Sequence, residues 1–248
     1  MSHAMRRVST RLGELDCQVV EALAEGASPE LAVVLCHGFG APASDLVPLA
    51  MELVELKPEL GAKVRFVFPA APLSLSAMGM PHARAWFHLP QEVLMGQERD
   101  WDKFAVATPE GLAQARRGLM SLLSALSAAT KLPYGRIVLG GFSQGGMVTT
   151  DVALRLEEAP AGLCILSGTL ICQDDWKQRA EKRTSLPVLQ SHGRVDNVLA
   201  YGQAEQLRDL LTGAGLPVEF IPFNGPHTIA PEVLERMAEF LHTRLTSR

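Results

Sequence analysis

The sequence predicts an α/β fold in which helices cover both faces of a doubly wound, mostly parallel sheet. Short apolar runs with β-branched residues alternate with longer segments of helical periodicity, and this alternation builds a parallel sheet through right-handed crossovers. Most of the apolar runs are continuous, which is typical of strands buried on both faces. The chain has 248 residues, of which 47% are hydrophobic. We therefore expect a single domain over residues 1–248 with one sizeable core.

The individual elements follow from periodicity and capping signals. Thr108 and Pro109 suit the start of the first predicted helix, because they provide a cap and a first helical residue. Apolar side chains repeat along this helix at the spacing of one face, which predicts a stripe toward the core. The stripe comprises Leu112, Ala115, Leu119, Leu122 and Leu126. The predicted helices are 108–131, 144–157, 198–213 and 231–245, and the predicted strands are 15–23, 31–38, 64–70, 136–141, 162–168, 187–193 and 217–223.

Residues 72–107 fit neither pattern. This segment has weak periodicity and concentrates Met, Trp and Phe, and a long irregular insertion in a compact domain is usually functional or mobile. We expect a flap-like insertion, with helical material around 91–103. Its apolar side chains either line an acyl pocket or form core beneath the insertion. They are Leu73, Leu75, Met78, Met80, Trp86, Phe87, Leu94 and Met95.

Composition narrows the class of protein. The net charge is −4, and the absence of a basic cluster argues against a nucleic-acid partner. No secretory signal is recognisable, and no apolar run approaches the roughly 20 residues that span a bilayer. The four cysteines lack zinc or redox spacing, and Cys36 and Cys164 lie inside apolar strands. We expect a cytoplasmic protein, monomeric or homodimeric, without integral membrane association, metal or organic cofactor.

The segment GFSQG, residues 141–145, fits the G-x-S-x-G pattern. A strand is predicted to end at Gly141 and a helix to begin after Gln144, which is the context of a nucleophile elbow. Gly141 and Gly145 lack the side chains that would clash in such a turn, so the Ser143 hydroxyl stands exposed. A glycine-rich phosphate turn is the alternative, but no Lys-Ser or Lys-Thr follows. Ser143 is therefore the candidate nucleophile.

A serine nucleophile needs a histidine base and a carboxylate that orients it. His227 lies in a Gly/Pro loop between the last strand and the last helix, from which an imidazole can reach the elbow. Asp196 follows the preceding strand and is the candidate acid; Asp174 and Asp175, after the strand before that, are the alternatives. His192 is expected to be a buried residue that shapes the acid's loop.

Two backbone N–H groups are expected to bind the oxyanion. Gln144, directly after the nucleophile, supplies one, and the loop after an early strand supplies the other. The segment CHGFG, residues 36–40, is such a loop, and Phe39 N–H is the candidate donor. We expect His37 to be a structural histidine.

These motifs together resemble the phospholipase/carboxylesterase family of α/β-hydrolases, which includes bacterial carboxylesterases and acyl-protein thioesterases. The motifs are LCHGFG, GFSQGG, HGRVDNV and GPHTI, with FPAAP, RAWF and LSGTL beside them. The resemblance covers about residue 31 to the C-terminus and implies an α/β-hydrolase fold. It implies the triad Ser143, Asp196 and His227. Phe39 stands where the family more often has Leu, and His88 where it commonly has Asp.

The expected function is hydrolysis of carboxylic esters with short- to medium-chain acyl groups through an acyl-enzyme. The substrate would be a small-molecule or lipid-like acyl ester, with Leu75, Met78, Met80, Trp86 and Phe87 as candidate substrate-binding residues. Hydrolysis of acyl thioesters or lysophospholipids by the same triad is one alternative. A catalytically silent α/β-hydrolase domain used for binding is the other.

Overall fold

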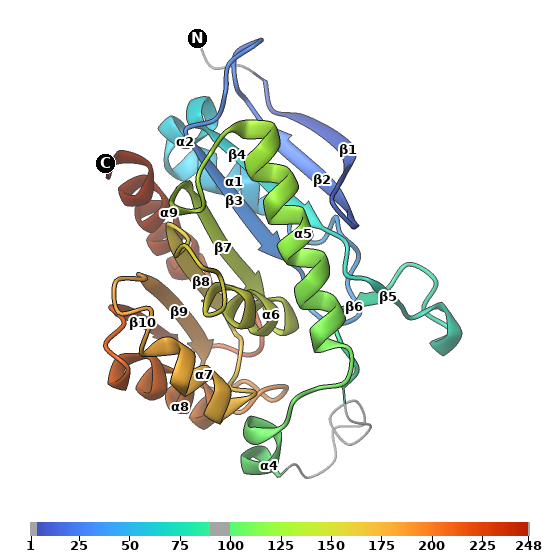
Figure 1. Cartoon of the computed structure of the whole chain (residues 1–248), viewed down its shortest axis with the longest axis vertical. Coiled ribbons are helices and arrows are strands. Elements are labelled where there is room, and N and C mark those ends of the chain that lie inside the picture. Colours follow the sequence, from blue (N-terminus) through green and yellow to red (C-terminus); the bar gives the residue numbers. More distant parts are fainter. Residues whose placement is uncertain (1–3, 90–99, 248) are drawn as a thin grey trace.

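A single eight-stranded sheet forms the centre of the protein (Figure 1). The computed structural model describes residues 4–89 and 100–247. In spatial order the strands run β1-β2-β4-β3-β7-β8-β9-β10, and every pair from β4 to β10 is parallel while β1 and β2 are antiparallel. This confirms the predicted mostly parallel sheet. The strands are β1 (Arg6–Leu12), β2 (Leu15–Glu21), β3 (Leu31–Cys36), β4 (Val64–Pro69), β7 (Ile137–Phe142), β8 (Gly162–Leu166), β9 (Val188–Gly193) and β10 (Val218–Phe223).

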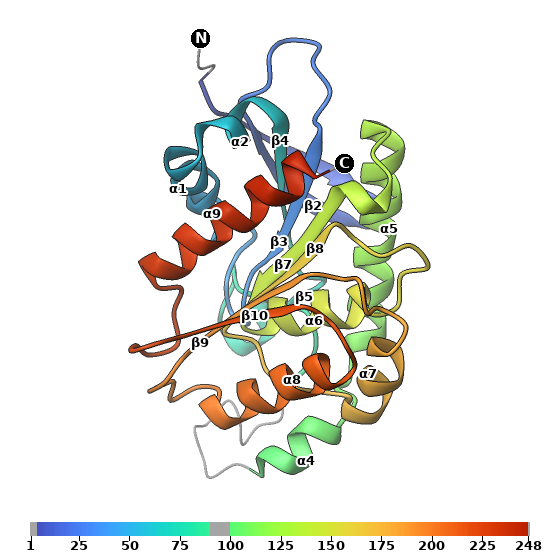
Figure 2. The same cartoon turned by 90° about the vertical axis from the view of Figure 1, so that its left-hand side faces the viewer.

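Helices cover both faces of this sheet, as Figure 2 shows edge-on. One face packs against α1 (Pro48–Leu56), α2 (Pro58–Lys63) and α9 (Pro231–Thr246). The other packs against α5 (Leu112–Thr130), α6 (Gln144–Ala153), α7 (Gln173–Ala180) and α8 (Tyr201–Gly213). The predicted apolar stripe of α5 is at most 1% exposed at every position. Within residues 4–89 and 100–247, none of the helices has the length and apolar character needed to cross a membrane.

Helix α5 starts later than the sequence predicts. Its first residue is Leu112 rather than Pro109, because Gly111 adopts φ 90° and a left-handed residue cannot continue a right-handed helix. The carbonyl of Glu110 instead accepts a hydrogen bond from His88 N–H at 2.9 Å. This long-range contact ties the start of the helix to the end of the irregular segment.

Strand β1 and the short helices α2 and α7 were not predicted. Six of the seven β1 residues are exposed, so the strand lacks the apolar run that marks the others. It forms because β2 offers it an antiparallel edge, from Arg6 opposite Glu21 to Leu12 opposite Leu15.

The segment 72–107 contains local structure where it is described. Strands β5 (Leu73–Ser74) and β6 (Arg84–Ala85) form a two-stranded sheet around a 3-10 turn, and α4 (Trp101–Val106) follows. Figure 1 shows the β5–β6 hairpin beside the edge toward which β3 and β7 point. Leu94, Met95 and most of the helical material expected at 91–103 lie outside the described residues.

Candidate active site

Ser143 occupies a strained turn between β7 and α6. Its backbone has φ 56° and ψ −120°, a conformation that residues other than glycine rarely adopt and that clusters at functional sites. Two backbone hydrogen bonds hold it: Ser143 N–H donates to the Leu166 carbonyl at 2.8 Å, and its own carbonyl accepts from Met147 N–H at 3.2 Å. The predicted strand–turn–helix context of this serine is therefore present.

Gly141 and Gly145 make this turn possible because the backbone on either side passes too close for a side chain. A Cβ on Gly141 would lie 2.3 Å from the carbonyl carbon of Gly145. A Cβ on Gly145 would lie 1.9 Å from the Cys36 carbonyl oxygen and 2.6 Å from that of His37. The start of α6 thus rests directly on the end of β3.

This contact places the loop after β3 against the candidate nucleophile. A Cβ built on Gly38 would lie 3.4 Å from Ser143 Cβ. The N–H groups of Phe39 and Gln144 donate to no acceptor among the described residues. Two unpaired N–H groups beside a serine hydroxyl can bind a developing oxyanion. Ser143 is only 9% exposed, so it does not stand exposed as the sequence predicts.

His37 fixes the shape of this loop. Its Nε2 accepts a hydrogen bond from Ala71 N–H at 3.1 Å, so the proton is on Nδ1, which donates to the Gly38 carbonyl at 2.8 Å. Burial lowers the pKa of His37, and the hydrogen bond to Gly38 only partly opposes this. The neutral ring is a structural group, as the sequence predicts.

The irregular segment braces the elbow through the side chain of Gln144. Gln144 Oε1 accepts from Trp86 N–H and Gln144 Nε2 donates to the Phe87 carbonyl, each at 2.8 Å. Trp86 Nε1 donates to the His37 carbonyl at 2.9 Å. Trp86 and Phe87, which are neighbours in the chain, therefore connect the turn at Ser143 to the loop after β3. This role of the Gln144 side chain was not predicted; the only signal in the sequence is a polar amide directly after Ser143.

The candidate substrate-binding residues divide by burial. Trp86 and Phe87 have no exposed surface, which favours the core alternative for these two side chains, and their role in substrate binding stays a prediction. Leu75 is 6% exposed and belongs to a small apolar cluster. Met80 is partly buried and packs against this cluster. Met78 is exposed on the turn of the β5–β6 hairpin.

Phe39 packs against the same cluster as Leu75 and Met80. Its neighbour Gly40 donates its N–H to the Arg84 carbonyl at 2.9 Å. The β5–β6 hairpin and the loop after β3 are therefore joined by both backbone and side-chain contacts.

Asp196 and His227 form a short hydrogen bond. His227 Nδ1 lies 2.6 Å from Asp196 Oδ2, and the other carboxylate oxygen accepts the N–H groups of Val198 and Leu199 at 2.8 Å each. The Asp196 side chain is completely buried. Burial alone would raise the pKa of Asp196, but hydrogen bonds from His192, His227 and Leu199 outweigh it and hold that pKa well below its usual value.

The loop of His227 is fixed beside the elbow. The His227 ring packs on the ring of Phe142, the residue before Ser143, with 4.7 Å between centroids. Ser167, directly after β8, donates its hydroxyl to the Thr228 carbonyl at 2.9 Å. Within the described residues Ser143 Oγ forms no hydrogen bond, and catalytic hydrogen bonds often tighten only when substrate binds.

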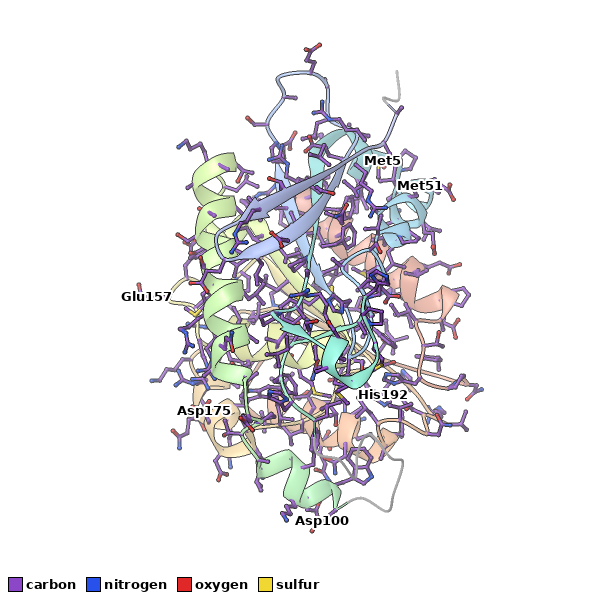
Figure 3. The ribbon with its side chains drawn as sticks, turned by 90° about the vertical axis from the view of Figure 1, so that its right-hand side faces the viewer. Met5, Met51, Asp100, Glu157, Asp175 and His192 are labelled. Atoms are coloured by element: carbon purple, nitrogen blue, oxygen red, sulfur yellow. The ribbon has the colours of Figure 1, made fainter. Side chains whose placement is uncertain are left out.

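The alternative acids Asp174 and Asp175 lie elsewhere. Asp175 pairs with Arg155 and Arg179, and Arg155 also bonds the buried Asp151 at 3.2 Å. Figure 3 shows Asp175 well apart from His192, the neighbour of the acid loop. Asp174 is exposed on α7. Neither of them pairs with a histidine of the described chain.

The structure also locates the groups relevant to metals and redox chemistry. In the part of the chain that is described, no group of three or more His, Cys, Asp or Glu is arranged to hold a metal ion. The four cysteines are buried and free. Burial raises the pKa of the Cys17 thiol to about 12, which disfavours the reactive thiolate.

A parallel sheet with a serine at a strained turn after β7, and acid and histidine in the loops after β9 and β10, is the arrangement of the α/β-hydrolase fold. The model of the Phospholipase/Carboxylesterase family matches residues 15–245. The chain belongs to this family and is a hydrolase of the carboxylesterase and thioesterase type.

Relatives agree with this assignment. Acyl-protein thioesterase 1 of Mycosarcoma maydis is 30% identical over 232 residues, covering 87% of this chain and 92% of the relative. The protein of the same name from Eremothecium gossypii is 29% identical over 220 residues, covering 86% and 88%. The crystal structure of esterase PE8 superimposes with a TM-score of 0.77 at 27% identity, covering 93% of this chain and 99% of that one.

The contact at Gly145 yields a test of the elbow. The substitution Gly145→Ala should abolish ester hydrolysis and lower the melting temperature, because the new methyl group would overlap the Cys36 carbonyl. Gly202→Ala is the matched control, since a Cβ there meets nothing within 4 Å, and it should keep both properties. Differential scanning fluorimetry and an ester assay measure the pair. Full activity in the Gly145→Ala protein would contradict the geometry described.

Proposed function

We propose that the protein hydrolyses carboxylic esters with short- to medium-chain acyl groups through a covalent acyl-enzyme on Ser143. The observation that carries the proposal is the 2.6 Å bond between His227 Nδ1 and the buried Asp196 carboxylate, next to a serine in a strained strand-to-helix turn. In this proposal Ser143 is the nucleophile, His227 the base and Asp196 the group that orients the base.

Each proton in the reaction has a donor and an acceptor. His227 Nδ1 binds Asp196, so its Nε2 is free to accept the Ser143 hydroxyl proton as Oγ attacks the ester carbonyl carbon. The tetrahedral adduct collapses, the alcohol leaves with that proton, and the acyl group remains on Oγ. Water then attacks the acyl carbon while His227 takes its proton, and returning that proton to Oγ releases the carboxylic acid.

The negative charge of each tetrahedral adduct requires donors that are already in place. The N–H groups of Phe39 and Gln144 are unpaired among the described residues and flank Ser143. One such donor typically lowers the barrier by about 3 kcal/mol. The braces from His37 and Trp86 support this role because they hold both N–H groups before substrate arrives.

Acyl thioesters are the second candidate substrate. The support is the naming of two relatives as acyl-protein thioesterases, at 29% and 30% identity. The same steps apply, with a thiol as the leaving group. Lysophospholipid hydrolysis by the same residues remains an alternative prediction, and a silent binding domain is disfavoured by the paired acid and histidine beside the serine.

The cellular compartment, the natural substrate and the oligomeric state of the protein also stay predictions. The four free, buried cysteines support a reducing compartment, in line with the cytoplasmic location expected from the sequence. We propose small-molecule or lipid-like acyl esters as substrates and a monomer or homodimer as the active species.

Labelling with a fluorophosphonate tests the nucleophile. The probe should form one adduct, on the tryptic peptide that contains Ser143, because it reacts with serines activated by a base. Ser143→Ala should abolish labelling, whereas Ser124→Ala, at an exposed position of α5, should retain it. Mass spectrometry of the intact and digested protein measures the adduct. An unlabelled folded protein would overturn the proposal.

Substitution of the acid tests the orienting role. Asp196→Asn should lower kcat on a p-nitrophenyl ester by about 10³- to 10⁴-fold, as the loss of a triad carboxylate does elsewhere. Because the pKa of Asp196 is held low, the carboxylate stays charged as pH falls toward the usual aspartate value of about 3.9. The deficit should therefore persist across mildly acidic pH.

Asp174→Asn is the control for this experiment, since the residue is exposed on α7, and it should keep full turnover. Near-normal turnover in Asp196→Asn, or a comparable loss in Asp174→Asn, would place the acid elsewhere.

A further inference from the structure

A second histidine binds the candidate acid. His192 Nε2 lies 3.1 Å from Asp196 Oδ2 and 2.9 Å from the Leu199 carbonyl oxygen. Both partners are acceptors, so Nε2 carries the proton and shares it between them. Asp196 Oδ2 therefore accepts from two imidazoles, His192 and His227.

The orientation of the His192 ring leaves one of its nitrogen atoms without a hydrogen-bond partner. The side chain is fully buried, and its Nδ1 has no hydrogen-bond partner. A buried acceptor without a partner is unfavourable, and an apolar side chain of similar size would fill the space without that penalty. The bonds made by Nε2–H are what stabilises this orientation.

Those bonds close a small ring of interactions around the carboxylate. Leu199 donates its N–H to Asp196 Oδ1 and accepts the His192 proton at its carbonyl. His192 thus fixes one carboxylate oxygen directly and the other through Leu199. It acts from β9, whereas His227 reaches the same oxygen from the loop after β10.

We propose that His192 is a positioning residue that sets both the orientation of Asp196 and the share of its negative charge available to His227. This inference rests on the proposed triad. Two donors on one oxygen compete for the same charge. Without His192, the carboxylate would favour the protonated form of His227 more strongly but would hold the ring less well.

Few other titratable groups face this pair among the described residues. Tyr201, from α8, contacts the His192 ring edge-on at 6.3 Å between centroids, and the Arg194 guanidinium lies 5.3 Å above the Tyr201 ring. The His227 ring faces Asp196 and the uncharged ring of Phe142. Tyr201 and Arg194 stay constant in the variants below.

The test compares His192→Leu with His192→Gln. His192→Leu removes the donor, so kcat should fall about tenfold with little change in KM, the loss expected for one hydrogen bond to a charged group. The acidic limb of the kcat/KM profile should move to higher pH, because the Asp196 oxygen then accepts from His227 alone. The amide N–H of glutamine can reach the position of Nε2, so His192→Gln should restore both quantities toward the wild-type values.

Two further variants separate positioning from packing. Ser191→Ala alters the neighbouring buried residue of β9, whose hydroxyl also lacks a partner, and should leave the pH profile unchanged. His192→Asn is polar but too short to reach Asp196, so it should behave as His192→Leu and serves if that protein does not fold.

A lowered melting temperature with unchanged kcat and pH profile in the folded His192→Leu and His192→Asn proteins would overturn the inference. The proposed function would still stand if the wild type carries the fluorophosphonate adduct and Asp196→Asn is inactive. An unlabelled wild-type protein would instead remove the proposed function itself.

Discussion

The close approach of α6 to the end of β3 is the constraint on which the rest of the site depends. With Gly145 pressed against the Cys36 and His37 carbonyls, no side chain fits, and Ser143 must take up a strained backbone. The same contact sets the loop after β3 against Ser143, so two unpaired N–H groups flank the serine. The close backbone packing thus holds the N–H donors in position beside Ser143. They do not have to move when negative charge develops on the oxyanion.

Two residues from the described part of segment 72–107, Trp86 and Phe87, stabilise this arrangement. The Gln144 side chain accepts the Trp86 N–H and donates to the Phe87 carbonyl, and Trp86 Nε1 donates to the His37 carbonyl. Part of what the sequence suggests to be a flap is therefore core that fixes the elbow. On the opposite side Asp196 is held by backbone and imidazole donors, so the acid is rigid before any substrate enters.

The sequence predicted the elements that depend on local signals. Continuous apolar runs marked the buried strands, and the order of Ser143, Asp196 and His227 followed from loops at the carboxyl ends of parallel strands. It did not predict features created by long-range contacts. The late start of α5 reflects the left-handed Gly111 together with the bond from His88 N–H to the Glu110 carbonyl. The Trp86 N–H bonds the distant Gln144 side chain, and the exposed β1 pairs with an edge offered by β2.

The most direct measurement is rapid-quench mass spectrometry with two donors of one acyl group, p-nitrophenyl octanoate and an octanoyl thioester. Both donors should give the same octanoyl adduct on the peptide containing Ser143, and it should decay at one common rate, because the second half of the reaction does not depend on the leaving group. Turnover of either donor without an adduct on Ser143, or with the acyl group on another residue, would contradict it.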